Sequence, residues 1–167
     1  MIQTEKKAAW VMLLCAVFWS IGGIFIKLIP WNALVIAGVR SLIAAGILLI
    51  YMHRTGVRFV LNRYSLASGA ALGGTMLLFV STNKLTTSAN AIVLQYTAPI
   101  FVLVISALFF REKLKRRDIV VCALVFAGIT LFFFDSLTPG GILGNVLAIL
   151  SGVSFASTMV ISGRSDN

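Results

Sequence analysis

Long apolar stretches, separated by short polar segments, are the main pattern of this chain. A helix that crosses a bilayer needs about 20 mostly apolar residues. The stretches are continuous and lack the two-residue alternation of barrel strands. The pattern therefore predicts an all-α membrane protein, a polytopic helical bundle. The expected spans run near 8–28, 33–52, 64–82, 89–110, 119–134 and 141–162.

Composition supports the bilayer as the solvent. Hydrophobic residues make up 59% of the 167 positions and charged residues 11%. A soluble domain carries roughly 45–50% apolar and about 25% charged residues, and a chain of this size cannot hide the excess in a core. The first stretch is too long for a cleaved signal peptide and further spans follow it, which predicts a retained helix.

The distribution of the basic residues predicts the orientation. Cytoplasmic loops carry an excess of Lys and Arg, so we expect the bundle in the inner (plasma) membrane with a cytoplasmic N-terminus. The net charge of +9 is then a topology signal with a modest attraction to membrane lipid, and it argues against a nucleic-acid partner. In this orientation the outer loops hold Lys27 and Lys84, and the inner segments hold Lys6, Lys7, Arg54, Arg58, Arg63, Arg111, Lys113, Lys115, Arg116, Arg117 and Arg164.

Polar or bulky groups at membrane depth mark candidate functional residues, because burying them there is costly. Trp19 and Ser20 lie in the middle of the first span. Trp19 is too deep for an interfacial belt, and it either lines a cavity or packs. Gly22 and Gly23 follow and permit close approach of another helix. Arg40, in the second span, either snorkels to the outer surface or faces the bundle and meets an anionic group such as a substrate carboxylate.

A polar cluster is predicted at the outer end of the third and fourth spans. The third span ends in Ser81-Thr82-Asn83-Lys84 and the fourth begins near Ser88-Ala89-Asn90. These residues either cap the two helix ends or form the rim of a substrate path. Earlier in the third span, Gly69 and Gly73 lie one helical turn apart, a spacing typical of close helix contact.

The fourth span carries the most informative segment, Gln95-Tyr96-Thr97-Ala98-Pro99. Proline has no backbone donor, so the carbonyl oxygen of Gln95 loses its helical partner. Because lipid cannot satisfy such a group, the segment is expected to face protein or a water-filled cavity. Gln95, Tyr96 and Pro99 are therefore predicted to line a cavity, and a purely structural kink is the alternative.

The chain offers no chemistry for catalysis. No Asp or Glu lies in the middle of a span, and Glu112, Asp118 and Asp135 all lie at span ends. Cys15 and Cys122 lie in separate apolar runs without metal-ligating neighbours. The sequence also lacks a nucleophile–base pair and a phosphate-binding glycine loop, so we expect no enzymatic activity, no metal site and no cofactor.

The order of residues in the fourth span is similar to that of a known family. Residues 90–101 carry a small residue, an apolar stretch and a proline followed by an aromatic, and a glutamate follows just past the inner end. These positions are Ala91, Pro99, Phe101 and Glu112. This pattern resembles the EamA-type transporters of the drug/metabolite transporter superfamily, in which residues equivalent to Trp19, Arg40 and Gly128 are also frequent.

The resemblance implies a ten-helix transporter built from two five-helix repeats of opposite orientation around a central cavity. Residues 1–135 would form the first five-helix repeat, and residues 136–167 the first helix of the second inverted repeat. The rest of the second repeat is expected in the same, longer chain, of which this sequence is a truncated part. A second subunit is the alternative source.

The expected function is transmembrane transport of a small-molecule substrate through a central cavity by alternating access, with export as the direction. The substrate class is an amino acid, another small metabolite or a drug-like solute. The alternatives are a non-transporting membrane scaffold that binds partner proteins and an inactive truncated remnant. The predicted substrate path comprises Trp19, Ser20, Arg40, Asn83, Asn90, Gln95, Tyr96 and Pro99.

Overall fold

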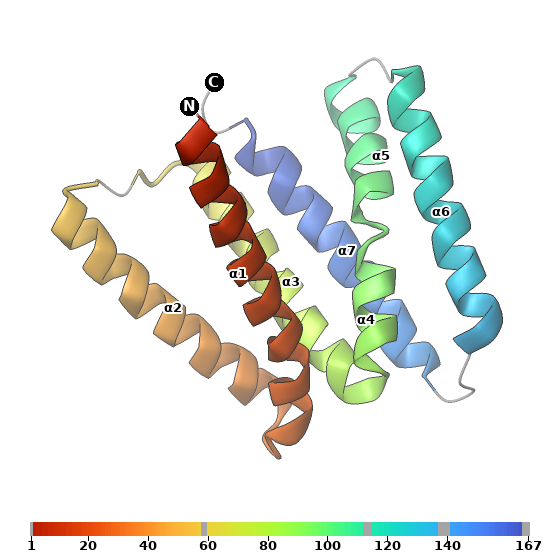
Figure 1. Ribbon diagram of the computed structural model, residues 1–167, viewed down its shortest axis with the longest axis horizontal. Helices are drawn as coiled ribbons and strands as arrows, with labels where there is room; N and C mark the ends of the chain where they lie inside the picture. The colour runs from red at the N-terminus through yellow and green to blue at the C-terminus, as the bar shows by residue number, and fades with distance from the viewer. Residues whose placement is uncertain (1, 58–59, 112–114, 137–140, 165–167) are drawn as a thin grey trace.

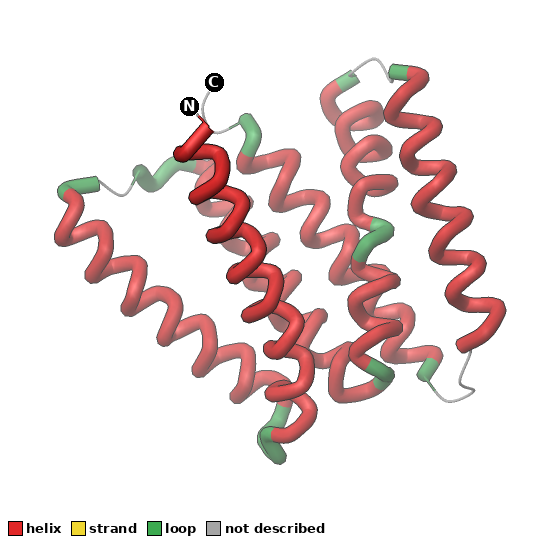
Figure 2. The backbone as a smooth tube through the Cα atoms, in the orientation of Figure 1, coloured by secondary structure: helices red, strands yellow, loops and turns green. Residues whose placement is uncertain are grey.

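The computed structural model is a bundle of α-helices, and its described residues contain no strand (Figures 1 and 2). It describes the backbone of residues 2–57, 60–111, 115–136 and 141–164, and the side chains of 8–57, 60–111, 115–131 and 141–164. The start of the first helix and the end of the last lie at the same end of the bundle (Figure 1). The helices are α1 Ile2–Leu28, α2 Ala33–Thr55, α3 Arg63–Leu85, α4 Ser88–Gln95, α5 Ala98–Phe110, α6 Arg116–Ser136 and α7 Ile142–Ser162.

The predicted polytopic all-α architecture is confirmed. Five segments are long and apolar enough to cross a membrane, and they correspond to α1, α2, α3, α4 together with α5, and α7. α6 is not among them, and its side chains from residue 132 onward lie outside the described part of the chain. The predicted span near 119–134 therefore stays a prediction, as does the division into repeats at residue 135.

Polar side chains at the helix starts explain where three of the helices begin. The side-chain oxygen of Asn32 accepts a hydrogen bond from the backbone N–H of Leu34 at 3.0 Å, and that of Asn62 accepts from Ser65 at 2.6 Å. The hydroxyl oxygen of Thr87 accepts from the N–H of Asn90 at 3.1 Å. Each bond satisfies a donor that the first turn of a helix leaves without a partner.

Most of the large apolar side chains lie on the outside of the bundle. Leu42 is 74% exposed, Leu108 73% and Phe109 78%. In water such a surface would cause aggregation, whereas lipid tails solvate it without cost. The burial pattern is therefore that of a membrane protein, with its packed interior limited to a few contacts between helices.

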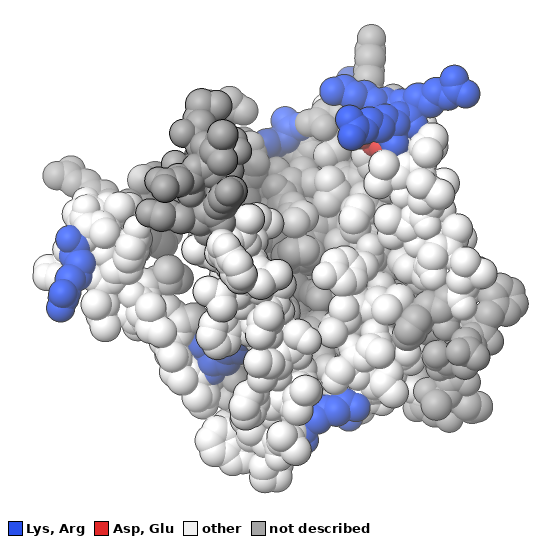
Figure 3. Space-filling model, viewed as in Figure 1, with Lys and Arg blue, Asp and Glu red and all other residues white. Residues whose placement is uncertain are grey.

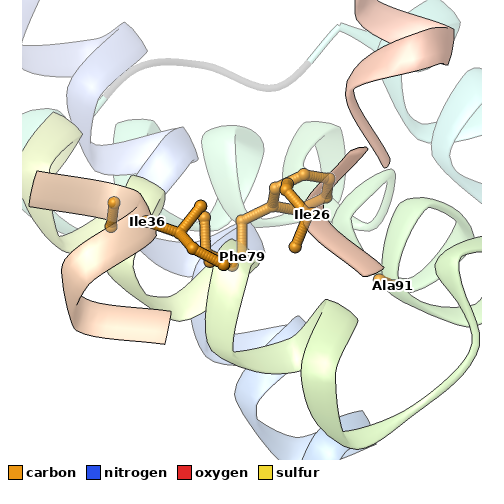
Figure 4. Close-up of a cluster of buried hydrophobic side chains, with 6 residues drawn as sticks. Ile26, Ile36, Phe79 and Ala91 are labelled. Atoms are coloured by element: carbon orange, nitrogen blue, oxygen red, sulfur yellow. The ribbon is translucent and has the colours of Figure 1, made fainter. Parts of the chain in front are cut away.

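One of these contacts is a small core at the end of the bundle opposite the termini (Figures 1 and 4). It joins the last turns of α1, the first turns of α2 and α4, and the end of α3. Lys84 of α3 adds a polar tie, because its ammonium group donates to the carbonyl oxygen of Ile29, just past the end of α1. The buried members of the core are Ile26, Ile36, Ala37, Phe79, Val80 and Ala91.

α7 packs most extensively against α3 and also contacts α4 and α5. Its buried face consists of small residues, which let the two backbones approach closely. The hydroxyl of Ser154 donates to the carbonyl oxygen of Ala71 in α3 at 2.7 Å. A β-carbon at Gly74 would lie 3.1 Å from the Ser154 hydroxyl oxygen. The buried α7 residues are Gly144, Ala148, Ser151, Gly152, Ala156 and Val160.

The prediction of a close helix contact at Gly69 and Gly73 is wrong. A β-carbon added at either residue would meet no atom within 4 Å. The contact of α3 with α7 instead uses the neighbouring face of α3, which carries Ala71 and Gly74. A small-residue spacing identifies a helix that can pack closely, but it does not fix which face does so.

Candidate functional site

The fourth span is discontinuous. α4 ends at Gln95 and α5 begins at Ala98. At the break the backbone N–H of Thr97 donates to the carbonyl oxygen of Leu94 at 3.1 Å, one residue short of the helical partner, and the Thr97 hydroxyl donates to the same oxygen at 2.6 Å. Pro99 lies in the first turn of α5, where its missing N–H costs nothing. The interruption predicted from Gln95–Pro99 is thus present.

The break packs against α7 at Gly152. A β-carbon on this glycine would lie 3.0 Å from the hydroxyl oxygen of Thr97 and 3.3 Å from the carbonyl oxygen of Gln95. Pro99 leaves that carbonyl without a helical donor, and the packing directs it at protein rather than at lipid. Glycine at position 152 is therefore what allows the irregular backbone to lie directly on α7.

Gln95 ties the break to both α7 and α3. Its amide nitrogen donates to the hydroxyl oxygen of Ser151 at 3.1 Å, and that hydroxyl donates to the carbonyl oxygen of Thr75 at 3.4 Å. Ser151 and Thr75 are fully buried, while Gln95 is half-buried. Sequence reasoning missed Ser151 and Thr75. The available signal was the clustering of serine with small residues in the last apolar stretch.

The predicted outer polar cluster forms at the turn between α3 and α4. The amide nitrogen of Asn90 donates to the Thr86 hydroxyl oxygen at 3.4 Å, and the Thr86 hydroxyl donates to Asn145 Oδ1 of α7 at 3.5 Å. The caps of the two helices are Thr86 and Thr87 rather than the asparagines. The interpretation that residues 81–84 and 88–90 cap the two helix ends is therefore wrong, because the caps are the two threonines between these segments.

Two buried oxygens in the last turn of α3, Thr82 Oγ1 and Asn83 Oδ1, have no hydrogen-bond partner among the described residues. Both residues are fully buried. The Asn83 nitrogen donates to the carbonyl oxygen of Phe79 at 3.0 Å, so only the oxygen side of this amide is unsatisfied. It lies 3.8 Å from the position of a β-carbon on Gly23 of α1, beside the Ser88 hydroxyl. An unpartnered buried acceptor costs about 1–3 kcal/mol.

The remaining predicted path residues lie on the surface of the described bundle. Trp19 is 59% exposed and Tyr96 64% exposed, and Ser20, Arg40 and Pro99 are also exposed. The structure thus brings the two asparagines together at the α3–α4 turn and places Gln95 at the other end of α4. The role of every predicted residue in a substrate path stays a prediction.

One group of basic residues lies away from this site. Figure 3 shows a group of Lys and Arg over the turn between α5 and α6. Arg164, past the end of α7, places its guanidinium carbon 3.7 Å from the ring centre of Phe110, which holds α7 to α5 at that end. The described residues contain no group of three His, Cys, Asp or Glu side chains that could hold a metal ion.

These features define a class of protein: a multi-pass membrane protein whose interior carries a broken helix and buried amides. The chain belongs to the EamA-like transporter family, whose sequence model matches residues 6–134. Members of this family are membrane transporters rather than enzymes. The match extends over the first five predicted spans. No curated protein and no solved structure matches the chain.

Proposed function

We propose that this chain moves a small metabolite across the inner membrane by alternating access, with export as the direction and a cytoplasmic N-terminus. The observation that carries the proposal is the broken fourth span, whose half-helices meet at Tyr96 and Thr97 and lie on α7. Discontinuous helices are tolerated in membranes where they are buried in protein or line a cavity, and transporters place binding sites at them.

The break also supplies a hinge. The N–H of Thr97 bonds one residue short of its helical partner, and Pro99 has no N–H to offer, so the regular hydrogen-bond ladder does not continue from α4 into α5. A tilt of α5 relative to α4 then disturbs few backbone bonds. Alternating access requires such an element, because one side of the site must open while the other closes.

The charge distribution supports the proposed orientation. Arg54 lies in the last turn of α2, Lys115 just before α6, and Arg116 and Arg117 in its first turn. These helix ends lie at the same end of the bundle as the start of α1 and the end of α7 (Figure 1). Of the described Lys and Arg residues, Lys27 and Lys84 lie at the opposite end, and Arg40 lies in the first half of α2. The positive-inside rule therefore favours a cytoplasmic location of both chain ends.

Transport in Gln95→Ala and Tyr96→Ala variants tests the site. Cells that express the chain are loaded with labelled amino acids and amines, and the rate of efflux is measured. Both variants should lose roughly tenfold or more in rate, with membrane insertion unchanged. Leu108→Ala, on the lipid-exposed face of α5, is the matched control. Wild-type efflux in both site variants would remove Gln95 and Tyr96 from the path.

Water access separates a carrier from a membrane scaffold. In a background with Cys15→Ala and Cys122→Ala, single cysteines at positions 95 and 96 are treated with a water-soluble maleimide. A carrier predicts labelling that a transported solute changes. A dry protein interface predicts that both positions are protected, and that result would favour the scaffold.

A further inference from the structure

Three side-chain amides of α3 and α4 share one bonding pattern: each uses its NH2 group inside the protein. The Asn83 nitrogen donates to the carbonyl oxygen of Phe79. The Asn90 nitrogen donates to Thr86 Oγ1, and the Gln95 nitrogen donates to Ser151 Oγ. Each nitrogen thus has one protein partner and keeps a second N–H, whereas each amide oxygen has no partner among the described residues.

The orientation of these amides follows from the groups they meet. The carbonyl oxygen of Phe79 is an acceptor only, so the nitrogen of Asn83 must face it. The hydroxyl proton of Ser151 is used on the carbonyl oxygen of Thr75, so its oxygen must accept from the nitrogen of Gln95. For Asn90 the Thr86 hydroxyl gives its proton to Asn145 Oδ1, which fixes the amide in the same way.

The oxygens are left without donors. Asn83 Oδ1 is fully buried and has no partner. The described residues provide no donor to Asn90 Oδ1 or Gln95 Oε1 either. Lys84, the cation closest in sequence, is occupied by the carbonyl oxygen of Ile29. Each of these amides thus keeps a wholly unpartnered acceptor, and the oxygen of Asn83 is the one that is fully buried.

We propose that this chain selects solutes that carry N–H donors, that is, amines and ammonium groups, and that Asn83 Oδ1 is one of the oxygens that bind them. This inference rests on the proposed transport function and specifies its substrate class. Neutral amide oxygens stabilise an ammonium group through charge-assisted hydrogen bonds. An amide oxygen cannot hydrogen-bond to a carboxylate or phosphate oxygen, because both are acceptors only.

Binding at Asn83 requires α1 to move. Its oxygen is buried and lies 3.8 Å from the position of a β-carbon on Gly23 of α1. Ser88 Cβ and Oγ lie 3.6 and 3.7 Å from the same position. A methyl group there is ordinary van der Waals contact, so Gly23→Ala should keep binding. A Gly23→Leu side chain would overlap the space beside Asn83 and should prevent it. The two variants separate access to the oxygen from packing of α1.

The test uses solutes that differ only in their charged end. The thermal stability of the purified chain in detergent is measured with 2-phenylethylamine against 3-phenylpropionate, and with butylamine against pentanoate. We expect both amines to raise the midpoint of unfolding and both carboxylates to leave it unchanged. Stabilisation by the carboxylates, or no preference for the amine in either pair, would overturn the proposal.

Two substitutions of Asn83 separate recognition from structure. Asn83→Leu and Asn83→Asp both lose the bond to the Phe79 carbonyl, so a merely structural role predicts equal effects. If Asn83 Oδ1 binds the amine, Asn83→Leu should lower the affinity for 2-phenylethylamine by about tenfold, as expected for the loss of one charge-assisted bond. The Asn83→Asp variant should bind the amine at least as tightly as the wild type. Equal weakening in both variants would overturn the role of Asn83.

The outcome is independent of whether the chain transports at all. If efflux of a carboxylate depends on Gln95 while no amine binds, the transport proposal stands and the substrate class is wrong. If amines bind through Asn83 but no solute moves, the substrate class stands as a binding specificity and the transport proposal fails.

Discussion

At the scale of single residues, hydroxyl groups show most clearly where sequence stops being informative. A serine or threonine in an apolar helix ordinarily donates to the carbonyl four residues earlier, as Ser157 and Thr158 do. Ser151 and Ser154, in the same helix, instead reach carbonyl oxygens of α3. Which hydroxyl donates to another helix depends on which face of α7 packs against α3. That face cannot be identified from a single sequence.

The amides and the proline were predictable because their chemistry does not depend on a neighbour. Asn83, Asn90 and Gln95 are costly at membrane depth wherever they point, and Pro99 lacks an N–H in any fold. Sequence therefore predicted the break and the polar cluster. Trp19 and Arg40 show the limit, since both lie exposed on the described bundle and only the residues covering them would reveal a role.

Gly152 is the residue at which the smallest change should have the largest structural effect. Gly152→Val places methyl groups into Thr97 Oγ1 and the Gln95 carbonyl, so we expect a loss of about 1–3 kcal/mol in stability, as for other overpacked interiors. Gly69→Val is the matched control, because a β-carbon there meets nothing within 4 Å. Unfolding midpoints of the two purified variants check this, and equal midpoints would contradict the packing of the break on α7.

At the scale of elements, the decisive feature is that α4 and α5 are two helices rather than one. The break was foreseeable from Pro99, whereas its placement against Gly152 was not, because helix pairing is a property of the assembled bundle. The same holds for α3, whose apparent small-residue stripe at Gly69 and Gly73 does not contact α7. Sequence thus defined the elements and left their contacting faces open.

Pro99→Ala tests whether the break matters for function. Alanine restores a backbone N–H at position 99, which can donate to the carbonyl oxygen of Gln95. It favours a continuous helix by up to about 3 kcal/mol. We expect stability to be kept or raised and efflux to fall, because the hinge stiffens. Efflux rates and unfolding midpoints are measured on the same preparations. A variant with wild-type efflux would show that the break has a structural role only.

At the scale of the whole molecule, α7 holds the bundle together. It contacts α3, α4 and α5, whereas the described part of α6 contacts mainly α5. The sequence placed the last helix at the start of a separate repeat, a division that remains a prediction. In the structure this helix is nonetheless an integral part of the same packed unit, since its serines bond to α3.

A cross-link tests this arrangement. In the background without native cysteines, Gly74→Cys together with Ser154→Cys should form a disulfide on mild oxidation, because a β-carbon at Gly74 lies 3.1 Å from the Ser154 hydroxyl oxygen. Gly73→Cys with Ser154→Cys is the control and should stay reduced. Mass spectrometry of the digested protein shows whether each of the two variants has formed the disulfide. A bond in the control pair alone would place a different face of α3 against α7.

The pairing of α3 with α7 also implies a delay during biosynthesis, because the two helices are far apart in the sequence. The two bonds join residues 76 and 83 positions apart. A ribosome adds about 5–20 residues per second, so α3 is made roughly 4–17 s before its partner residues in α7. During that interval the face of α3 that receives Ser151 and Ser154 has no partner. We therefore expect insertion chaperones and quality-control proteases to encounter an incomplete bundle in which this face of α3 is unpaired. Insertion of α7 covers the face.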